Sequence, residues 1–156
     1  MAKKVKEKNY RPTIVNRKAR HEYAFLDKYE AGIVLKGTEV KSIRLGKVQL
    51  GEAFCVFKRG ELYVRELHVS PYTEASLFNV DARRERKLLL NRKELEKLES
   101  GMNEKGLTIV VSKIFFSSRN MVKLEIALAK GKKLYDKRQS LKEKDAKRAM
   151  DRRNDY

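Results

Sequence analysis

The fold is decided by residues 107–128, which read LTIVVSKIFFSSRNMVKLEIAL. In the second half, Met121–Leu128, apolar and charged side chains alternate, which is the period of a strand with one buried face. The first half, Leu107–Phe116, is rich in β-branched and aromatic residues, and Ser117–Asn120 has the composition of a turn. The stretch therefore predicts two antiparallel strands joined as a hairpin.

Four shorter strands are expected on the N-terminal side of this hairpin. They cover Tyr23–Leu26, Gly32–Leu35, Ala53–Lys58 and Leu62–Leu67. The last two flank the turn-forming Gly60, which predicts a second hairpin.

Two short helices complete the pattern. Thr38 is the candidate N-cap of the first helix. Asn91 and Glu94 have the spacing of a capping box for a second helix over residues 92–99, and Gly101 is expected to terminate it. About six short strands with such helices cannot form a doubly wound sheet. The sequence predicts a mainly β protein, a small antiparallel Greek-key barrel of the oligonucleotide-binding (OB) type with two or three short helices and a basic C-terminal tail.

Charge is concentrated at the two ends of the chain. The 156 residues include 38 Lys and Arg against 21 Asp and Glu, a net charge of +17. Residues 1–22 carry a net +6 and residues 130–156 another +6, so the termini hold +12 of the +17. Basic arms on a folded module favour a nucleic-acid partner. A merely solvated charge excess and a membrane-surface role are the alternatives, and no segment combines a basic face with a wide apolar face.

The charge and hydropathy pattern divides the chain into three parts. Residues 1–13 are expected to be a flexible basic arm, and residues 14–129 the barrel. Residues 130–156 have too few large apolar side chains to offset the entropy of ordering them. We expect this tail to be disordered alone and helical when bound to RNA, with a stable helix packed on the barrel as the alternative.

Several function classes find no support in the sequence. Cys55 is the only cysteine, so an intrachain disulfide is impossible and a reducing compartment is expected. There is no secretory leader pattern and no apolar run of the roughly 20 residues that span a bilayer, which predicts a cytoplasmic protein. No phosphate-binding loop or metal-ligand spacing occurs, and no cofactor is expected. The two histidines, His21 and His68, leave a small ribonuclease as a weak possibility.

Order and spacing of four segments add a resemblance. They are NRKARHEY at 16–23, EAGIVLKGTEVKSIR at 30–44, RKLLLN at 86–91, and ALAKGKK at 127–133 with DKR at 136–138. In this order the chain resembles the small protein B family, the SsrA-binding proteins, over essentially its whole length. Ala82 and Val111 depart from prolines that the family often has, and we expect residues 80–85 to be more flexible for that reason.

The resemblance implies a fold, a function and a set of partners. The fold is an OB barrel that holds the tRNA-like domain of transfer-messenger RNA. The complex would rescue stalled ribosomes, with the aminoacyl-tRNA-carrying elongation factor as an indirect partner through the RNA. The basic tail would become helical in the decoding centre and the empty mRNA channel. We expect a monomer without enzymatic activity, and a barrel-type structural ribosomal protein is the runner-up.

Site residues follow from the matching motifs. Glu30, Leu89 and Asn91 match RNA-contacting residues of the family, His21 lies in a matching segment, and charge and position add the remaining two. The expected RNA-binding set is His21, Glu30, Arg44, Leu89, Asn91 and Lys123. The expected ribosome-binding set in the tail is Gly131, Lys132, Lys133, Tyr135, Asp136, Lys137 and Arg138.

Overall fold

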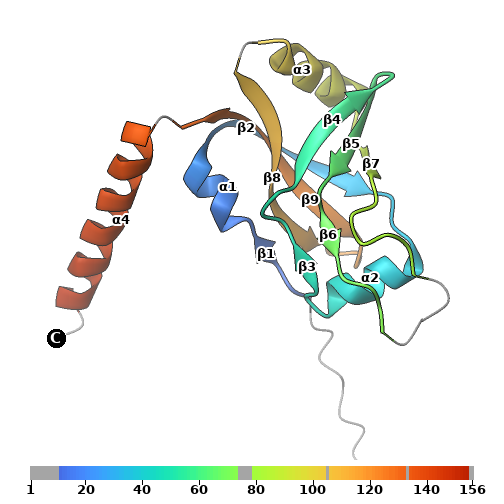
Figure 1. The fold of residues 1–156 in the computed structure, drawn as a ribbon, viewed down its shortest axis with the longest axis horizontal. Coiled ribbons are helices and arrows are strands. Elements are labelled where there is room, and N and C mark those ends of the chain that lie inside the picture. Colours follow the sequence, from blue (N-terminus) through green and yellow to red (C-terminus); the bar gives the residue numbers. More distant parts are fainter. Residues whose placement is uncertain (1–10, 74–78, 105, 133, 155–156) are drawn as a thin grey trace, which may run out of the picture.

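A computed structural model describes residues 11–73, 79–104, 106–132 and 134–154 of the chain. Figure 1 shows a β-barrel with short helices around it and one long helix that stands apart. The elements are β1 (Ile14–Val15), α1 (Arg17–Glu22), β2 (Tyr23–Ile33), α2 (Gly37–Arg44), β3 (Val48–Gln49), β4 (Phe54–Lys58), β5 (Glu61–Arg65), β6 (His68–Val69), β7 (Arg86–Leu89), α3 (Arg92–Met102), β8 (Leu107–Phe116), β9 (Val122–Gly131) and α4 (Leu134–Asn154).

Antiparallel pairing closes the main sheet into a barrel. Within the described residues, the strands β2, β9, β8, β4, β5 and β7 are hydrogen-bonded in that order, and β7 pairs back to β2. The strands β4, β5 and β7 lie side by side in this sheet, and β8 returns after α3 to lie beside β4. This arrangement is a Greek key. The prediction of a mainly β, antiparallel Greek-key barrel is therefore confirmed.

Both predicted hairpins are present. The strands β8 and β9 pair from Leu107 opposite Lys130 to Phe116 opposite Val122. The β4–β5 hairpin turns at Arg59 and Gly60, whose φ angles of 52° and 77° are those of a type I′ turn.

Strand β2 corrects the prediction of two separate strands. It runs without a break from Tyr23 to Ile33, with a bulge between Phe25 and Asp27. The polar side chains of Asp27, Lys28 and Glu30 between the two predicted strands are exposed to solvent. The ladder to β9 satisfies the backbone there, so the strand does not need an apolar side chain at every second position.

Helix α1 was missed because it has no apolar stripe. Only Ala19 of its six residues is buried. Asn16 begins the helix: its Oδ1 accepts a hydrogen bond from the Ala19 N–H at 3.0 Å. The Asn16 amide nitrogen also donates to the carbonyls of Leu50 and Val111, both at 2.9 Å. This buried amide therefore ties α1 to the barrel.

The two predicted helices form, with different ends. Helix α2 begins at Gly37, after an N-cap at Lys36 rather than at Thr38. Helix α3 continues past Gly101, so the prediction that this glycine terminates the helix is wrong. A Cβ on Gly101 would lie 2.5 Å from Cδ2 of Leu128, so the glycine allows α3 to approach β9 closely.

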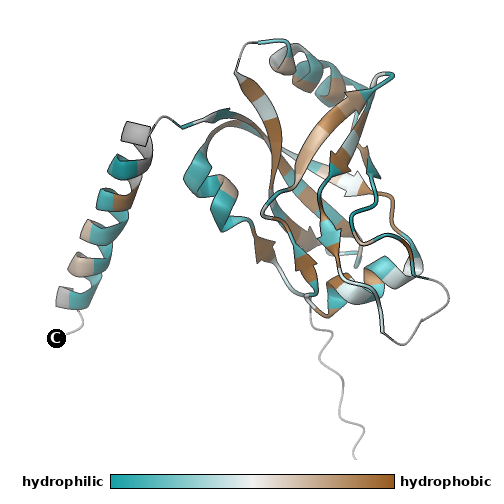
Figure 2. Cartoon of the chain, in the orientation of Figure 1, coloured by the Kyte–Doolittle hydropathy of each residue, from teal (hydrophilic) through white to brown (hydrophobic). Residues whose placement is uncertain are grey.

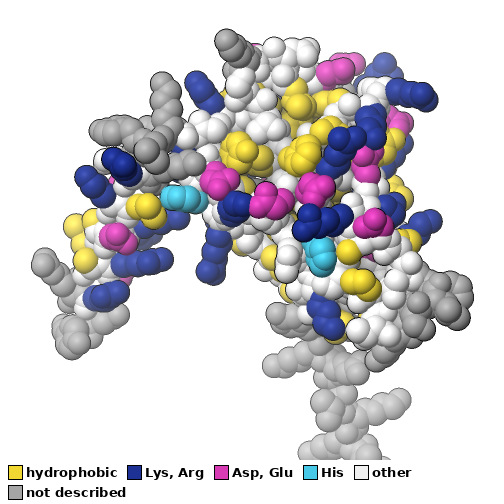
Figure 3. Space-filling view, viewed as in Figure 1, with side chains coloured by type: hydrophobic (Ala, Val, Ile, Leu, Met, Phe, Trp, Pro, Cys, Tyr) yellow, Lys and Arg dark blue, Asp and Glu magenta, His cyan; other side chains and the backbone are white. Residues whose placement is uncertain are grey.

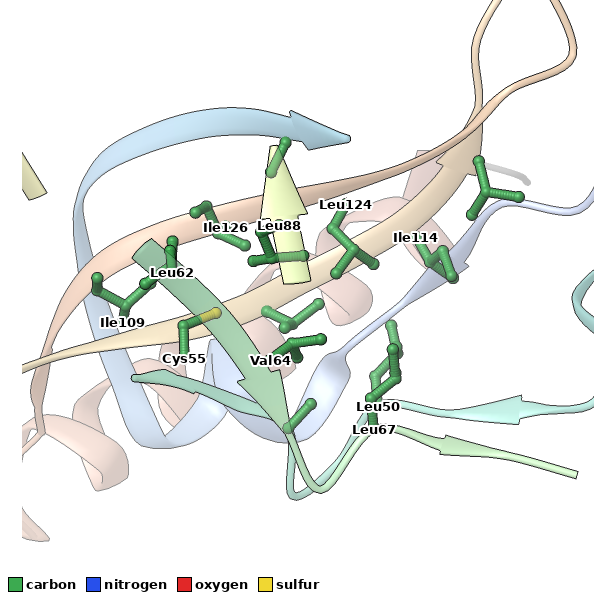
Figure 4. Close-up of a cluster of buried hydrophobic side chains, with 14 of the residues drawn as sticks. Leu50, Cys55, Leu62, Val64, Leu67, Leu88, Ile109, Ile114, Leu124 and Ile126 are labelled. Carbon is green, nitrogen blue, oxygen red and sulfur yellow. The ribbon is translucent and has the colours of Figure 1, made fainter. Parts of the chain in front are cut away.

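The barrel interior forms the main hydrophobic core. Figure 4 shows its side chains pointing toward one another from the surrounding strands. Residues at most 2% exposed include Cys55, Leu62, Val64, Leu67, Leu88, Ile109, Ile114, Leu124 and Ile126. Burial raises the pKa of the Cys55 thiol, so this residue is a neutral core side chain, as its apolar strand predicted.

Helix α4 stands apart from the barrel (Figure 1). Its side chains are exposed wherever the structure describes them, and Figure 2 shows hydrophilic residues along its length. Strand β9 continues to Gly131, two residues beyond the predicted end of the barrel at residue 129. The disorder of the isolated tail stays a prediction. None of the helices in the described residues has the length and apolar character needed to cross a bilayer.

Candidate nucleic-acid interface

Two of the expected RNA-contacting residues, Leu89 and Lys123, meet on the outer face of the barrel on either side of Gly32. In β2, Gly32 is the register partner of Leu89 in β7 on one side and of Lys123 in β9 on the other. The neighbours Ala31 and Leu124 are fully buried. Because side chains alternate along a strand, residues 32, 89 and 123 face outward. Half of the Leu89 side chain, 51%, is exposed to solvent.

The glycine keeps this part of the face shallow. A Cβ on Gly32 would lie 3.3 Å from Cβ of Leu89, which is tighter than ordinary contact. Without it, the flank of Leu89 is open toward β2. The result is an exposed apolar surface beside a lysine, a combination that suits an unstacked base and its phosphate.

Glu30 lies on the same face, two residues before Gly32. Its register partner in β9 is Glu125. The Glu125 carboxylate is engaged by the Ser112 hydroxyl at 2.7 Å, by Lys113 at 3.4 Å and by Lys28 at 3.6 Å. Burial alone would raise the pKa of Glu125, but the Ser112 hydrogen bond and the two lysines outweigh it and lower the pKa. Glu30 is exposed and has no such partner among the described residues, so its oxygens are available as acceptors.

Asn91 follows Leu89 by two residues and is the N-cap of α3. Its backbone N–H donates to Oε2 of Glu94 at 3.2 Å, which confirms this half of the predicted capping box. The residue is exposed, so it combines a helix-capping role with a position next to the outer face.

Two features of this face were missed from the sequence. The sequence indicates Gly32 only as the start of a strand. Phe115 is the β8 register partner of Lys123, and the Lys113 ammonium lies 5.3 Å from the centre of its ring. An outward aromatic residue in an otherwise apolar strand was the available signal. We name the set Glu30, Gly32, Leu89, Asn91, Phe115 and Lys123 the outer face.

A buried ion cluster joins α2 to β7, the strand that carries Leu89 of the outer face. Glu39 of α2 is 3% exposed and pairs with Arg86 of β7, which is fully buried, and with Arg84 at 2.6 Å. Arg86 also donates to the carbonyls of Leu67 at 2.7 Å and Ala82 at 3.2 Å. The cluster fixes α2 against β7, the strand that presents Leu89. Neither Glu39 nor Arg86 stood out in the sequence, because a charged residue is ordinarily solvated.

The remaining two RNA-binding candidates lie elsewhere. Arg44 is exposed at the end of α2. His21 is in α1, just before Tyr23, and β2 carries the chain roughly 30 Å from Tyr23 to Gly32 at about 3.3 Å per residue. The structure thus groups Glu30, Leu89, Asn91 and Lys123, and places His21 at the opposite end of β2.

The tail candidates begin beside α1. Gly131 pairs with Tyr23, and the Lys132 N–H donates to the Glu22 carbonyl at 2.8 Å. Lys133 lies outside the described residues. The other candidates lie in the first turns of α4, where Arg138 is exposed: Tyr135, Asp136, Lys137 and Arg138. Figure 3 shows further Lys and Arg side chains along this helix.

Enzymatic alternatives gain no support from the described residues. His21 lies in α1 and His68 in β6, and Figure 3 shows two separate histidine side chains. A two-histidine ribonuclease needs both imidazoles within reach of one phosphate. Among the residues described, no group of three or more His, Cys, Asp or Glu side chains is suited to hold a metal ion.

Comparisons with known proteins found a family, curated relatives and a solved structure that the chain resembles. Residues 13–156 match the family model described as SmpB protein. The SsrA-binding protein of Phocaeicola vulgatus is 55% identical over 139 residues, covering 89% of this chain and 93% of that protein. The SsrA-binding protein of Thermus thermophilus is 49% identical over 140 residues, covering 90% and 97%. A solved structure described as "tmRNA-SmpB: a journey to the center of the bacterial ribosome" superposes with a TM-score of 0.68 at 51% identity, covering 79% of this chain and 86% of that one.

Proposed function

Because the chain belongs to the SmpB protein family, we propose that it binds the tRNA-like domain of transfer-messenger RNA and delivers this RNA to stalled ribosomes for trans-translation. The observation that carries the proposal is the outer face. Three strands and the start of α3 bring an exposed leucine, an exposed carboxylate, an amide and a lysine together around one glycine. Relatives named SsrA-binding proteins and a structural neighbour described with tmRNA and the ribosome support it.

Each side chain of the outer face has a distinct role in this proposal. Leu89 is the apolar surface against which an unstacked base or a ribose packs. Glu30 accepts hydrogen bonds from a base edge or a 2′-hydroxyl, and Asn91 offers a donor and an acceptor. Lys123 and Arg44 bind phosphates, which position the RNA without reading its sequence.

The tail acts on the ribosome. We assign Gly131, Lys132, Lys133 and the first turns of α4 to the decoding centre and the empty mRNA channel, where the helix lies among ribosomal RNA phosphates. The elongation factor that carries aminoacyl-tRNA is an indirect partner through the RNA. The protein acts as a monomer in the bacterial cytoplasm and by binding alone, without catalysis.

Replacing Leu89 by Ala should weaken binding of the tRNA-like domain by about tenfold, because a base loses its apolar contact, worth on the order of 1 kcal/mol or more. Fluorescence anisotropy with the labelled domain measures this affinity. The matched control is Leu26→Ala, since Leu26 is equally exposed, at 55%, near the other end of β2. Equal losses for the two variants would contradict the assignment of the outer face.

Salt should separate the two kinds of contact on this face. The logarithm of the binding constant should fall linearly with the logarithm of salt concentration, and Lys123→Ala should reduce the slope by about 0.9, one phosphate contact. Leu89→Ala should lower the affinity without changing the slope, because no ion pair with RNA is lost. A salt-independent affinity would refute a phosphate-contacting interface.

Copurification tests the function as a whole. The tagged protein, expressed in bacteria and washed at high salt, should retain transfer-messenger RNA as its main bound RNA, identified by sequencing. A structural ribosomal protein would instead remain with washed ribosomal subunits. Enrichment of ribosomal RNA without transfer-messenger RNA would overturn the proposal.

A further inference from the structure

The root of the tail is bound to α1 by two hydrogen bonds. The Lys132 N–H donates to the Glu22 carbonyl at 2.8 Å, and Lys132 Nζ donates to the Arg20 carbonyl at 3.3 Å. Both carbonyls belong to the last turn of α1, whose C-terminal end favours a cation. Helix α4 begins two residues later, at Leu134, so α1 sets where the tail leaves the barrel. Figure 1 shows α4 beside α1.

A cleft of about 340 Å³ lies between these helices. One side belongs to α1, the floor to Lys132 just after β9, and the other side to α4. The lining residues are Arg20, His21, Lys132, Glu143, Lys144 and Lys147. Four cations and an imidazole thus surround one carboxylate.

This charge arrangement is unfavourable unless an anion is present. Arg20 and Lys132 face Lys144 and Lys147 across the cleft, and like charges brought together raise the energy of the closed arrangement. The side chains of Arg20, Lys144 and Lys147 are exposed and make no ion pair among the described residues. Several cations on the barrel, by contrast, are paired: Lys58 and Arg65 with Glu85, and Lys87 with Glu61.

We propose that the cleft between α1 and α4 binds the sugar–phosphate backbone of an RNA strand, with Arg20 and His21 on one side and Lys144 and Lys147 on the other. Phosphates between the helices replace repulsion by attraction, so RNA binding draws α4 toward α1. The inference rests on the proposed function, in which the barrel binds one RNA and the tail contacts another. The cleft lies at the Tyr23 end of β2, and the outer face lies at the Gly32 end. His21 therefore belongs to the tail site, not to the barrel face.

A binding experiment with matched variants tests the cleft. The probe is a fluorescein-labelled 12-nucleotide single-stranded RNA, added to the full chain at several salt concentrations. The double variant Lys144→Ala/Lys147→Ala should weaken binding by about tenfold and reduce the salt slope by about 1.4, two single-strand phosphates. The control is Lys142→Ala/Arg152→Ala, which removes the same charge from α4 residues outside the cleft lining. Its loss should be clearly smaller.

Coupling across the cleft is the decisive readout. Arg20→Ala and the Lys144/Lys147 double variant should be non-additive, because both helices hold the same phosphates. Arg20→Ala and the control variant should be additive. Lys144→Arg/Lys147→Arg keeps the charge and should keep the affinity. Equal losses for the cleft and control variants, or additivity across the cleft, would overturn the proposal.

The tRNA-like domain, measured in parallel, separates this inference from the proposed function. The cleft variants should bind that RNA within about twofold of the unmodified chain, because its phosphates contact the outer face. Failure of the unmodified chain to bind the tRNA-like domain would refute the proposed function. Normal binding of that domain, with no effect of the cleft variants on the 12-nucleotide RNA, would refute the cleft alone.

Discussion

Deletion of residues 134–156 is expected to abolish peptide tagging on stalled ribosomes while the affinity for the tRNA-like domain stays within about twofold. The outer face is built from β2, β7, β8, β9 and the start of α3, so it persists when α4 is removed. The deletion also removes positive charge and so weakens nonspecific binding to RNA. Measuring at moderate salt keeps this nonspecific contribution small. Tagging of a reporter protein made from a message without a stop codon measures the first effect, and anisotropy measures the second.

A scrambled tail is the control for this deletion. It keeps the composition and the charge of residues 134–156 but changes their order. If position-specific contacts matter, the scrambled chain should bind the tRNA-like domain normally and should still fail to tag. Full tagging by either altered chain, or equal loss of tagging and RNA affinity after deletion, would contradict the separation of barrel and tail roles.

Replacement of Glu39 by Ala should lower the free energy of unfolding by about 3–5 kcal/mol, because it leaves buried charges without a partner. The buried guanidinium of Arg86 would lose its carboxylate partner, because it pairs with Glu39. Total stabilities of single domains are only about 5–15 kcal/mol, so the variant should be close to unfolding at room temperature. Urea denaturation followed by circular dichroism measures the change.

A surface ion pair provides the matched control. Glu61 pairs with Lys87 at 2.9 Å, and both side chains are well exposed. Glu61→Ala should therefore cost less than about 1 kcal/mol. Similar losses for Glu39→Ala and Glu61→Ala would show that the buried cluster does not hold α2 against β7.

Acid should remove the contribution of Glu39. Burial alone would raise the pKa of this carboxyl, but hydrogen bonds from Arg84, the Lys36 N–H and Arg86 outweigh burial and hold the pKa below its ordinary value of 4.5. A lowered folded-state pKa stabilises the protein fully above the unfolded-state pKa, and the stabilisation is lost as pH falls through the folded value. The difference in unfolding free energy between the unmodified chain and Glu39→Gln should therefore shrink below pH 4.5. A difference that is constant down to pH 2.5 would contradict the ionised cluster.

The elements with a clear local pattern could be predicted from the sequence. The alternation in Met121–Leu128 predicts a strand with one buried face, and Val122, Leu124, Ile126 and Leu128 are indeed buried. Gly60 between two apolar runs predicts a hairpin. These signals are local, so a single sequence carries them.

Features that depend on tertiary pairing could not be predicted in the same way. The exposed middle of β2 has no strand period, because the ladder to β9, about 100 residues later, holds it extended. Helix α1 has one buried residue, and the buried amide of Asn16 holds it through partners in Leu50 and Val111. A glycine at position 101 suggests the end of a helix. Its close approach to Leu128, a residue of another element, cannot be seen in the sequence.

The candidate site shows the same division. Family motifs supplied Glu30, Leu89 and Asn91, and pairing register brings them beside Lys123. Gly32 and Phe115 became visible only once three strands were aligned, and Glu39 only once its burial was known. The structure places His21 in α1, before the start of β2, so it lies at the other end of that strand from Gly32. Sequence position alone does not reveal this separation, and an RNA contact by His21 stays a prediction.

Photo-crosslinking tests the central assignment most directly. A benzophenone amino acid is placed at Leu89 on the outer face or, as a control, at Arg59 in the exposed turn between β4 and β5. Each chain is irradiated with the tRNA-like domain of transfer-messenger RNA. We expect a strong covalent adduct from residue 89 and none above background from residue 59. An adduct from residue 59 without one from residue 89 would show that the RNA lies on a different side of the barrel.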